Sequence, residues 1–448
     1  MFWAFFFDFF CGCRIFIVLL QAFYDFRVGM SAKGANSTIV KNITSLGVLQ
    51  IANYLIPLIV IPFITRIFGT EVFGRVSYAQ NIVVYLTLIV NYGFEYSATR
   101  QIALAKDDLV KSRQLFWSVI TMKSLLLAAS FVLLGILALT VDRIAADPML
   151  YVCTALVNVG VVFFPTWYLQ GVQNMTKMAI FNLTIKLLGA ILILSIIRNA
   201  GQYQLYPLFL SVASMLVGIV AFWYVVKHYD LGGWIWDKSA FAEVARAGFP
   251  IFLNNVFVSL YTTINLTILG GFADDVQIGY FSGAQRLIIA ANMCVVMPIS
   301  TAVFPEMSRR FAESYGEWRR FFGRTLVIGG AIALCVSTVA FVLAPFIVRV
   351  MLGSAFAESV PLLRILSPLP FLVMTATILT VQGLYGQGLQ RFAPFVGIVL
   401  AILCMSSNLL LIPRIGVGGA AWSWVIAEVA ECVIVGVILI WHRRKCSI

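Results

Sequence analysis

Apolar stretches of about 20 residues recur along the chain, with short polar breaks between them. A helix rising 1.5 Å per residue needs about that length to cross roughly 30 Å of hydrocarbon. Because backbone groups in lipid must find partners within their own segment, each stretch predicts a spanning helix. The pattern thus predicts an all-α polytopic membrane protein with about twelve transmembrane helices. The predicted spans are 44–66, 76–94, 114–140, 149–170, 178–197, 206–226, 248–270, 278–304, 325–347, 362–386, 393–412 and 418–441.

The composition excludes a water-soluble fold. Of the 448 residues 61% are hydrophobic and only 11% are charged, and the mean hydropathy is +0.96. Soluble domains are about 45–50% apolar. The eight cysteines are scattered without C-x-x-C or histidine-paired spacing, so neither a disulfide framework nor a metal site is indicated, and no cofactor is expected.

The distribution of Lys and Arg predicts the orientation. If the chain starts on the inside, about nineteen of these residues fall on the cytoplasmic side and seven on the outer side. This agrees with the rule that short cytoplasmic loops are enriched in Lys and Arg. Both termini are therefore expected in the cytoplasm, and the net charge of +12 needs no nucleic-acid partner to explain it. The outer-side exceptions are Arg66, Arg75, Arg143, Arg198, Arg349, Arg364 and Arg414.

The first 29 residues do not fit the pattern. They are rich in phenylalanine, interrupted by Asp8 and Arg14, and their apolar run from Ile15 to Leu20 is too short to span. They resemble neither a secretory signal nor a further helix. We expect Met30 to be the true start and residues 1–29 to be a mis-annotated extension.

Two short motifs occur twice. The pattern G-x-x-S-x-A-Q begins at Gly74 and again at Gly279, and Y-x-Q-G-x-Q begins at Tyr168 and again at Tyr385. The copies fall on predicted spans two and eight and on spans four and ten, a shift of six helices, which indicates a duplication. Since six is even, the halves share an orientation and should be related by a pseudo-two-fold axis along the membrane normal.

This duplication predicts two six-helix lobes. We expect an N-lobe at 30–227, a cytoplasmic linker at 228–247 and a C-lobe at 248–448. A substrate site is expected where the lobes meet, which is the architecture of a transporter.

Three cations lie deep inside predicted spans, away from the span ends, namely Lys123, Lys186 and Arg286. Charged groups in hydrocarbon are costly and normally face a cavity or a partner. Three cations around one cavity would attract an anionic headgroup, and arginine can grip a phosphate with two parallel hydrogen bonds. The alternative for the lysines is that they snorkel to the cytoplasmic interface. Arg286 directly follows a repeated motif, which favours a functional role for it.

Other polar residues within the spans are candidates for binding or coupling. Glu428 and Glu431 share one face of the last span, where they either balance the cations, carry a coupling proton, or form a structural ion pair. Amide side chains suit sugar hydroxyls, although amides also hold membrane helices together. The amides considered are Gln80, Asn91, Asn254, Asn255, Gln285 and Gln382, of which Gln80, Gln285 and Asn255 are assigned to the substrate site.

Prolines should bend the first and the eighth predicted spans. Pro57 and Pro62 lie in the first span and Pro298 in the eighth, and each removes a backbone donor. Such bends would suit a gate or hinge, although kinks are common in membrane helices.

The chain resembles the polysaccharide-repeat flippases of O-antigen and related pathways, within the multidrug/oligosaccharidyl-lipid/polysaccharide exporter superfamily. The resemblance covers nearly everything from residue 44 onwards, and its most distinctive motifs lie in the first half. They are RIFGTEVFG at 66–74 with Ala79-Gln80, NYGFEYSATR at 91–100, and PTWYLQG at 165–171 with Met175.

The resemblance implies a multi-pass protein of the cell inner membrane. It would move oligosaccharide repeat units linked to undecaprenyl pyrophosphate from the cytoplasmic to the periplasmic leaflet by alternating access. The implied partners are this lipid-linked substrate and membrane lipids. A polysaccharide polymerase and a chain-length regulator are candidate protein partners. The protein is expected to function as a monomer.

Two other classes of function are alternatives to a flippase. A multidrug or metabolite antiporter of the same superfamily would share the fold, but usually carries an acid in its first helix, and 44–66 has none. A membrane-embedded polymerase or transferase needs acid and base groups converging on a pocket, often in a large loop. The longest loops here have about twenty residues, and His228 and His442 lie at helix ends.

Overall fold

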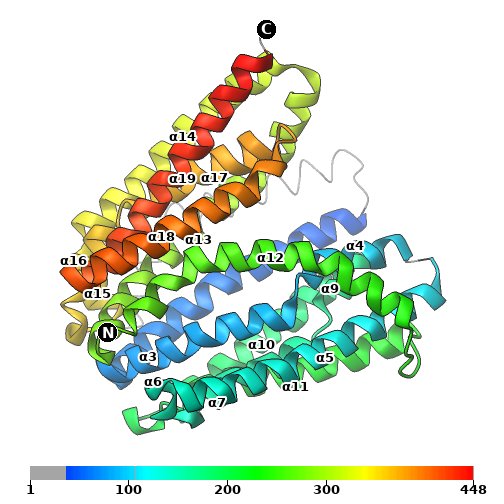
Figure 1. Cartoon of the computed structure of the whole chain (residues 1–448), viewed down its shortest axis with the longest axis horizontal. Helices are drawn as coiled ribbons and strands as arrows, with labels where there is room; N and C mark the ends of the chain where they lie inside the picture. The colour runs from blue at the N-terminus through cyan, green and yellow to red at the C-terminus, as the bar shows by residue number, and fades with distance from the viewer. Residues whose placement is uncertain (1–36, 106, 447–448) are drawn as a thin grey trace.

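Helices account for nearly all of the computed structural model, which describes residues 37–105 and 107–446 (Figure 1). The long helices are α3 (Ser37–Asn91), α5 (Leu109–Thr140), α10 (Met175–Ile196), α11 (Leu205–His228), α12 (Lys238–Leu269), α13 (Asp275–Glu313), α14 (Tyr315–Val342), α18 (Ala393–Ile415) and α19 (Val417–Cys446). The shorter ones are α4 (Phe94–Ala105), α6 (Asp142–Ala145), α7 (Pro148–Ala155), α8 (Val157–Phe163), α9 (Thr166–Gly171), α15 (Ala344–Met351), α16 (Ser359–Leu366), α17 (Leu369–Thr377) and the π-helix η3 (Ile378–Tyr385). Three 3₁₀ turns complete them, η1 (Ala200–Gln202), η2 (Ser354–Phe356) and η4 (Gln390–Phe392).

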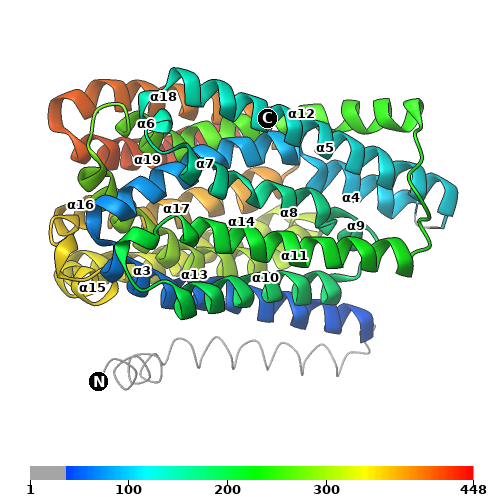
Figure 2. The same ribbon diagram turned by 90° about the horizontal axis from the view of Figure 1, so that it is seen from below.

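The chain crosses the membrane about twelve times. Within the described residues, eleven helical segments are long and apolar enough to span. The first of them turns back at Gly69, where φ is +66° and ψ is −172°, and so contains two crossings (Figure 2). Glycine reaches this left-handed backbone region without the steric cost that a β-carbon brings. The predicted all-α polytopic fold is therefore confirmed, whereas the expectation for residues 1–29 lies outside the described residues.

Two predicted spans differ from the single helices expected. The segment predicted at 149–170 consists of α7, α8 and α9, and the one at 362–386 consists of α16, α17 and the π-helix η3. Pro165 accounts for the break between α8 and α9, because it lacks an N–H and keeps Phe164 out of the helical region, at ψ 98°. Pro368 similarly follows the end of α16.

Three helices extend well beyond their predicted spans, and one of them is α14, which begins at Tyr315 rather than near 325. The helix α12 begins at Lys238 rather than near 248, because the Asp237 carboxylate accepts hydrogen bonds from the backbone N–H groups of Ser239 and Ala240. The bond from Ala240, followed by that from Ser239, holds the pKa of Asp237 below its usual value. The helix α13 runs on to Glu313, where Glu306 accepts hydrogen bonds from Arg309 and Arg310. These bonds lower the pKa of Glu306 to about 2.

The helices of residues 37–228 and those of residues 275–446 lie close together at one end of the molecule and diverge towards the other (Figure 1). We call the first end the Gly69 end, since it contains Gly69, Ala273, Asp275 and Phe356. The second is the Asp230 end, which contains the 229–237 connection and the start of α14 at Tyr315. The helix α12 runs between the two groups.

The buried apolar residues show the same asymmetry. One core at the Gly69 end mixes residues from both groups, such as Phe73 with Phe356, whose rings lie 5.5 Å apart. Towards the Asp230 end the cores are separate. One is built around Phe116 and Trp167 from the first group with Val244 of α12, and the others around Leu384 and Met374 from the second. The two groups therefore share a core at one end only. The lobe boundaries at 227 and 248 remain a prediction.

Candidate functional site

Arg286 joins the two copies of the repeated motif. It lies on α13 directly after the second copy, and its guanidinium donates to Gln80 Oε1 at 2.6 Å and to Ser77 Oγ at 3.2 Å, both in the first copy on α3. The guanidinium carbon also lies 4.8 Å from the centre of the Phe73 ring. Gln80 and Arg286, which the sequence both assigns to the substrate site, are thus in direct contact. Part of the hydrogen-bonding capacity of this guanidinium is therefore used by protein groups, and the side chain is only partly buried.

The backbones of the two motif copies approach closely beside this arginine. A β-carbon at Gly74 would lie 2.6 Å from the Gly279 nitrogen and would overlap the Asp275 carbonyl oxygen. A β-carbon at Gly279 would overlap the Thr70 carbonyl oxygen. The first residue of each motif copy must therefore be small for α3 and α13 to meet.

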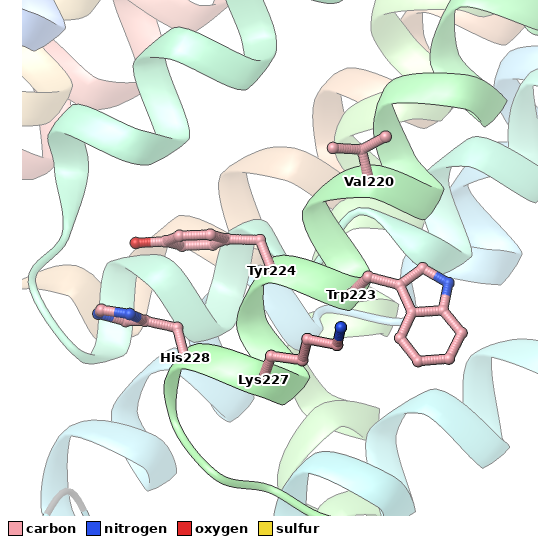
Figure 3. A pocket seen from close by; sticks show the side chains of 5 residues that line it. All are labelled: Val220, Trp223, Tyr224, Lys227 and His228. Atoms are coloured by element: carbon pink, nitrogen blue, oxygen red, sulfur yellow. The ribbon is translucent and has the colours of Figure 1, made fainter.

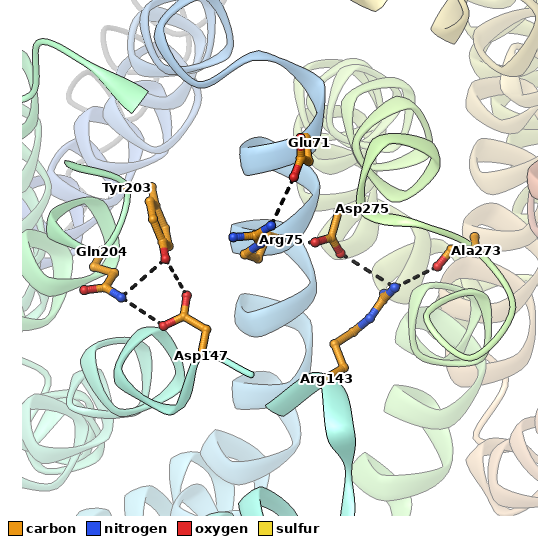
Figure 4. A network of polar contacts seen from close by, with 8 residues as sticks. All are labelled: Glu71, Arg75, Arg143, Asp147, Tyr203, Gln204, Ala273 and Asp275. Carbon is orange, nitrogen blue, oxygen red and sulfur yellow. Dashed lines mark hydrogen bonds and ion pairs between the residues drawn. The ribbon is translucent and has the colours of Figure 1, made fainter. Parts of the chain in front are cut away.

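An ionic cluster lies further towards the Gly69 end (Figure 4). Asp275 at the start of α13 pairs with Arg75 of α3 at 3.1 Å and with Arg143 of α6 at 3.6 Å. Arg143 also donates to the Ala273 carbonyl at 2.7 Å. Asp275 is 21% exposed, so these pairs are partly shielded from water. The cluster ties the first group of helices to the second.

Sequence reasoning missed this cluster, although a signal for it was present. Arg66, Arg75 and Arg143 are three of the seven arginines that violate the predicted charge bias. Each of them bonds to the other half: Arg66 donates to the Val350 carbonyl at 2.6 Å, and the other two meet Asp275. Arginines on the outer side, where the charge bias predicts few cations, therefore indicated contacts between the halves.

Lys123 lies apart from Arg286. It is buried in α5, 2% exposed, and its ammonium group donates to the Val161 carbonyl of α8 at 2.9 Å. In an unbroken helix that carbonyl would accept from the N–H of residue 165, but Pro165 has none. Lys123 therefore supplies the donor that the proline removes, which favours a structural role.

Lys186 is half-buried on α10, and no hydrogen bond or ion pair of its side chain lies among the described residues. The structure thus does not group the three predicted cations by direct contact. Arg286 alone bridges α3 and α13.

Glu428 and Glu431 lie in the interior of the second group of helices. Glu428 is 8% exposed and accepts a hydrogen bond from Trp424 Nε1 at 3.2 Å, and Glu431 accepts one from Thr380 of the π-helix η3 at 3.1 Å. Among the described residues no cation lies within ion-pair distance of either carboxylate. The structural ion pair considered from the sequence is therefore not formed within this part of the chain.

The amides divide into two kinds. Gln382 is fully buried and donates to the Ser300 carbonyl at 3.0 Å, which links η3 to α13. The side chains of Gln285, Asn254 and Asn255 make no hydrogen bond within the described part of the chain, and all three are at least partly exposed. Those three amides are accordingly free to meet a ligand.

The prolines do not interrupt their helices. Pro57 and Pro62 lie inside α3 and Pro298 inside α13, and the helical backbone continues through each. Threonine hydroxyls bond to carbonyls near them, Thr65 to Ile61 at 3.0 Å and Thr301 to Met297 at 2.9 Å. The gate or hinge role of these prolines stays a prediction.

Comparison with known proteins identifies relatives over nearly the whole chain. A family model described as "Polysaccharide biosynthesis protein" matches residues 39–311. A protein of Escherichia coli strain K12 named "Putative O-antigen transporter" is 26% identical over 413 residues, covering 90% of this chain and 97% of that protein. One of the same name from Shigella dysenteriae is 28% identical over 389 residues, covering 87% and 97%.

Solved structures share the fold. An inward-facing multidrug transporter of the MATE family, in the MOP superfamily, aligns with a TM-score of 0.69 at 14% identity, covering 91% of this chain and 98% of that one. The lipid II flippase MurJ in an inward closed conformation aligns with a TM-score of 0.65 at 14% identity, covering 88% and 86%. At such low identity these likenesses concern the fold alone.

These findings confirm the resemblance noted from the motifs. The expectation of a membrane transporter for surface-polysaccharide synthesis, rather than an enzyme, agrees with the matched family and the two curated relatives. The chain belongs to the polysaccharide biosynthesis protein family, whose model matches more than half of its length.

Proposed function

We propose that this protein flips oligosaccharide repeat units linked to undecaprenyl pyrophosphate from the cytoplasmic to the periplasmic leaflet of the inner membrane. The substrate class is supported by the two curated relatives, both named as O-antigen transporters. The charge bias supports placing the Asp230 end and both termini in the cytoplasm and the Gly69 end in the periplasm.

The asymmetric core is the observation that carries the mechanism. The two groups of helices share one core at the Gly69 end and have separate cores towards the Asp230 end. In the proposed orientation this arrangement is closed to the periplasm and able to part towards the cytoplasm. Alternating access then requires the contacts at the Gly69 end to break while new ones form at the Asp230 end.

Arg286 is the proposed anchor for the pyrophosphate. It lies between α3 and α13 with Gln80 as a partner, and a guanidinium can hold a phosphate with two parallel hydrogen bonds. Gln285 and Asn255, which have no hydrogen bond within the described residues, are the proposed contacts for sugar hydroxyls. Lys186 stays in the proposed site as a cation without a partner in the described region. Lys123 fits less well, because its ammonium group is already bonded to Val161.

Glu428 and Glu431 are the proposed coupling site. Two buried carboxylates three residues apart, with no cation at ion-pair distance among the described residues, are costly if both are ionised. Binding of a proton or a small cation would relieve that cost. The π-helix η3, which contacts Glu431 through Thr380, is an irregular element of the kind often found at functional sites.

A multidrug or metabolite antiporter is the second candidate. The likeness to the MATE-family transporter supports it at the level of the fold. The two candidates differ in phenotype, since an antiporter's loss raises drug sensitivity and leaves surface polysaccharide intact.

Deletion and complementation test the proposal. Removal of the gene should abolish surface polysaccharide, lipid-linked repeat units should accumulate inside the cell, and the intact gene should restore the polysaccharide. Unchanged surface polysaccharide in the deletion strain would reject the flippase function.

A further inference from the structure

A pocket of about 470 Å³ lies at the end of α11, away from the region between the two groups of helices. Figure 3 shows its lining, which is Val220, Trp223, Tyr224, Lys227 and His228. The helix α11 packs against α7, α8 and α10, and it lies on the side of the molecule opposite α14 and α19 (Figure 1). A ligand here would therefore be separate from the transported one.

The polar end of the pocket is cationic. Lys227 and His228 are exposed on the last turn of α11, and the Lys177 ammonium of α10 lies 5.2 Å from the centre of the Tyr224 ring. Neither lysine forms an ion pair with a carboxylate in the described residues. Lys177 also lies in the first turn of α10, a helix of 22 residues whose dipole favours an anion at this end; its own backbone N–H is taken by the Asn174 side chain at 3.3 Å, so its ammonium group is the contact for a ligand.

The aromatic side chains hold this end in place. The Tyr224 ring stacks on His228 with the centres 5.1 Å apart, and His228 meets Tyr229 edge to face at 4.9 Å. The Tyr229 hydroxyl in turn accepts a hydrogen bond from Asn174 Nδ2 at 3.1 Å, at the start of α10. All the residues that line the pocket belong to α11, and these contacts tie its last turn to the start of α10.

The other end of the pocket is apolar and faces outward. Trp223 and Val220 are 57% and 59% exposed, and Leu216 and Ile219 extend the exposed apolar strip along the same helix. This helix is a candidate membrane span, so the strip lies against acyl chains. An exposed tryptophan followed by a lysine one turn later is the usual order at a membrane interface.

We propose that this pocket binds the headgroup of an anionic phospholipid, with the phosphodiester between Lys177 and Lys227 and the acyl chains along Val220 and Trp223. Continuity of the cationic end with the lipid-facing strip favours an amphiphile over a free phosphate. In the orientation proposed above, the lipid belongs to the cytoplasmic leaflet. Binding itself does not depend on the transport function.

Native mass spectrometry of the purified full chain tests this site. The protein would be titrated with palmitoyl-oleoyl phosphatidylglycerol and, separately, with the zwitterionic phosphatidylcholine of the same chains. We expect retention of phosphatidylglycerol over phosphatidylcholine. Since one lysine contributes about fivefold near an anionic surface, the double variant Lys177→Gln/Lys227→Gln should bind about 25-fold more weakly.

Matched variants keep the test specific. Lys238→Gln removes another exposed lysine at the Asp230 end and should leave lipid binding unchanged. Lys227→Arg keeps the charge and should retain binding. Equal retention of the two lipids, or equal binding by the double variant and the wild type, would overturn the proposal. So would displacement of the lipid by inorganic phosphate at matched ionic strength, because the site would then recognise free phosphate.

Discussion

Gly74 and Gly279 occupy the same position in the two copies of the repeated motif, and they meet each other where α3 crosses α13. If the two copies arose by duplication, a segment that contacts its own copy lies on the pseudo-two-fold axis predicted between the halves. The same crossing brings Arg286, just after one copy, to Ser77 and Gln80 of the other. The repeated motif is therefore the surface on which the halves close at the Gly69 end.

The small size of Gly74 is predicted to be necessary for this closure. We expect Gly74→Ala to destabilise the protein by about 1–3 kcal/mol, because the added carbon overlaps the Asp275 carbonyl oxygen. Thermal unfolding in detergent measures the effect. Gly135→Ala on α5 is the matched control, since a β-carbon there meets open space, and it should leave the unfolding temperature unchanged or slightly higher. Equal behaviour of the two variants would refute the close contact.

Asp275 is predicted to hold the Gly69 end shut. The substitution Asp275→Asn removes its ion pairs with Arg75 and Arg143, each worth about 1 kcal/mol for partly exposed groups. The fraction of molecules that are open at the Gly69 end should then rise about five- to thirtyfold. Thiol labelling of a cysteine at Ser282, which is 2% exposed, reports the opening.

Glu71→Gln provides the control for the Asp275 experiment. Glu71 also pairs with Arg75, at 3.1 Å, but both residues lie on α3, so this pair does not join the two halves. Labelling of the Ser282 cysteine should stay at the wild-type rate in this variant. A rise as large as that caused by Asp275→Asn would mean that the labelling reports a general loss of charge.

Arg286 is predicted to be required for transport. In Arg286→Ala the guanidinium that reaches Gln80 is absent, so surface polysaccharide should be lost while the amount of protein in the membrane stays normal. Arg286→Lys keeps the charge without the planar fork and should restore only part of the transport. Full complementation by Arg286→Ala would show that this residue does not hold the substrate.

Lys123 is predicted to stabilise the break between α8 and α9. Lys123→Ala leaves the Val161 carbonyl without its donor, at a cost of about 1–3 kcal/mol. Thermal unfolding should register this loss, whereas transport per folded molecule should change little. A stable variant with impaired transport would instead support the substrate contact expected from the sequence.

The hydrophobic pattern predicted the helices well because a helix in lipid depends mainly on its own length and composition. It also placed the break between the first two spans at 67–75, where the chain turns at Gly69, because Arg66, Glu71 and Arg75 interrupt the apolar run there. It missed the three short helices at 148–171. The junction between α8 and α9 depends on Pro165 and on Lys123, which is more than 30 residues away and therefore invisible to a local pattern.

The candidate site was predicted only where a repeat pointed to it. Arg286 was favoured because it follows the repeated motif, Gln80 was selected as an amide and ends the first copy of that motif, and the two are in contact. Lys123 was selected from its depth in a span alone, and depth does not distinguish a ligand contact from a bond to a carbonyl. The Asp275 cluster was missed because Asp275 lies at a helix start, where an acid is ordinary.

Cross-linking of the Gly69 end tests the central claim most directly. In a variant carrying Arg75→Cys and Asp275→Cys, a bis-methanethiosulfonate reagent would tie α3 to α13 through two reducible disulfides, across the gap that the longer side chains fill. If the halves must part here during each cycle, the reagent should stop surface-polysaccharide synthesis, and a reductant should restore it. In each variant that carries only one of the two new cysteines beside the native ones, the reagent should leave surface-polysaccharide synthesis unchanged. Continued synthesis with the two helices fully cross-linked would contradict transport by alternating access between these halves.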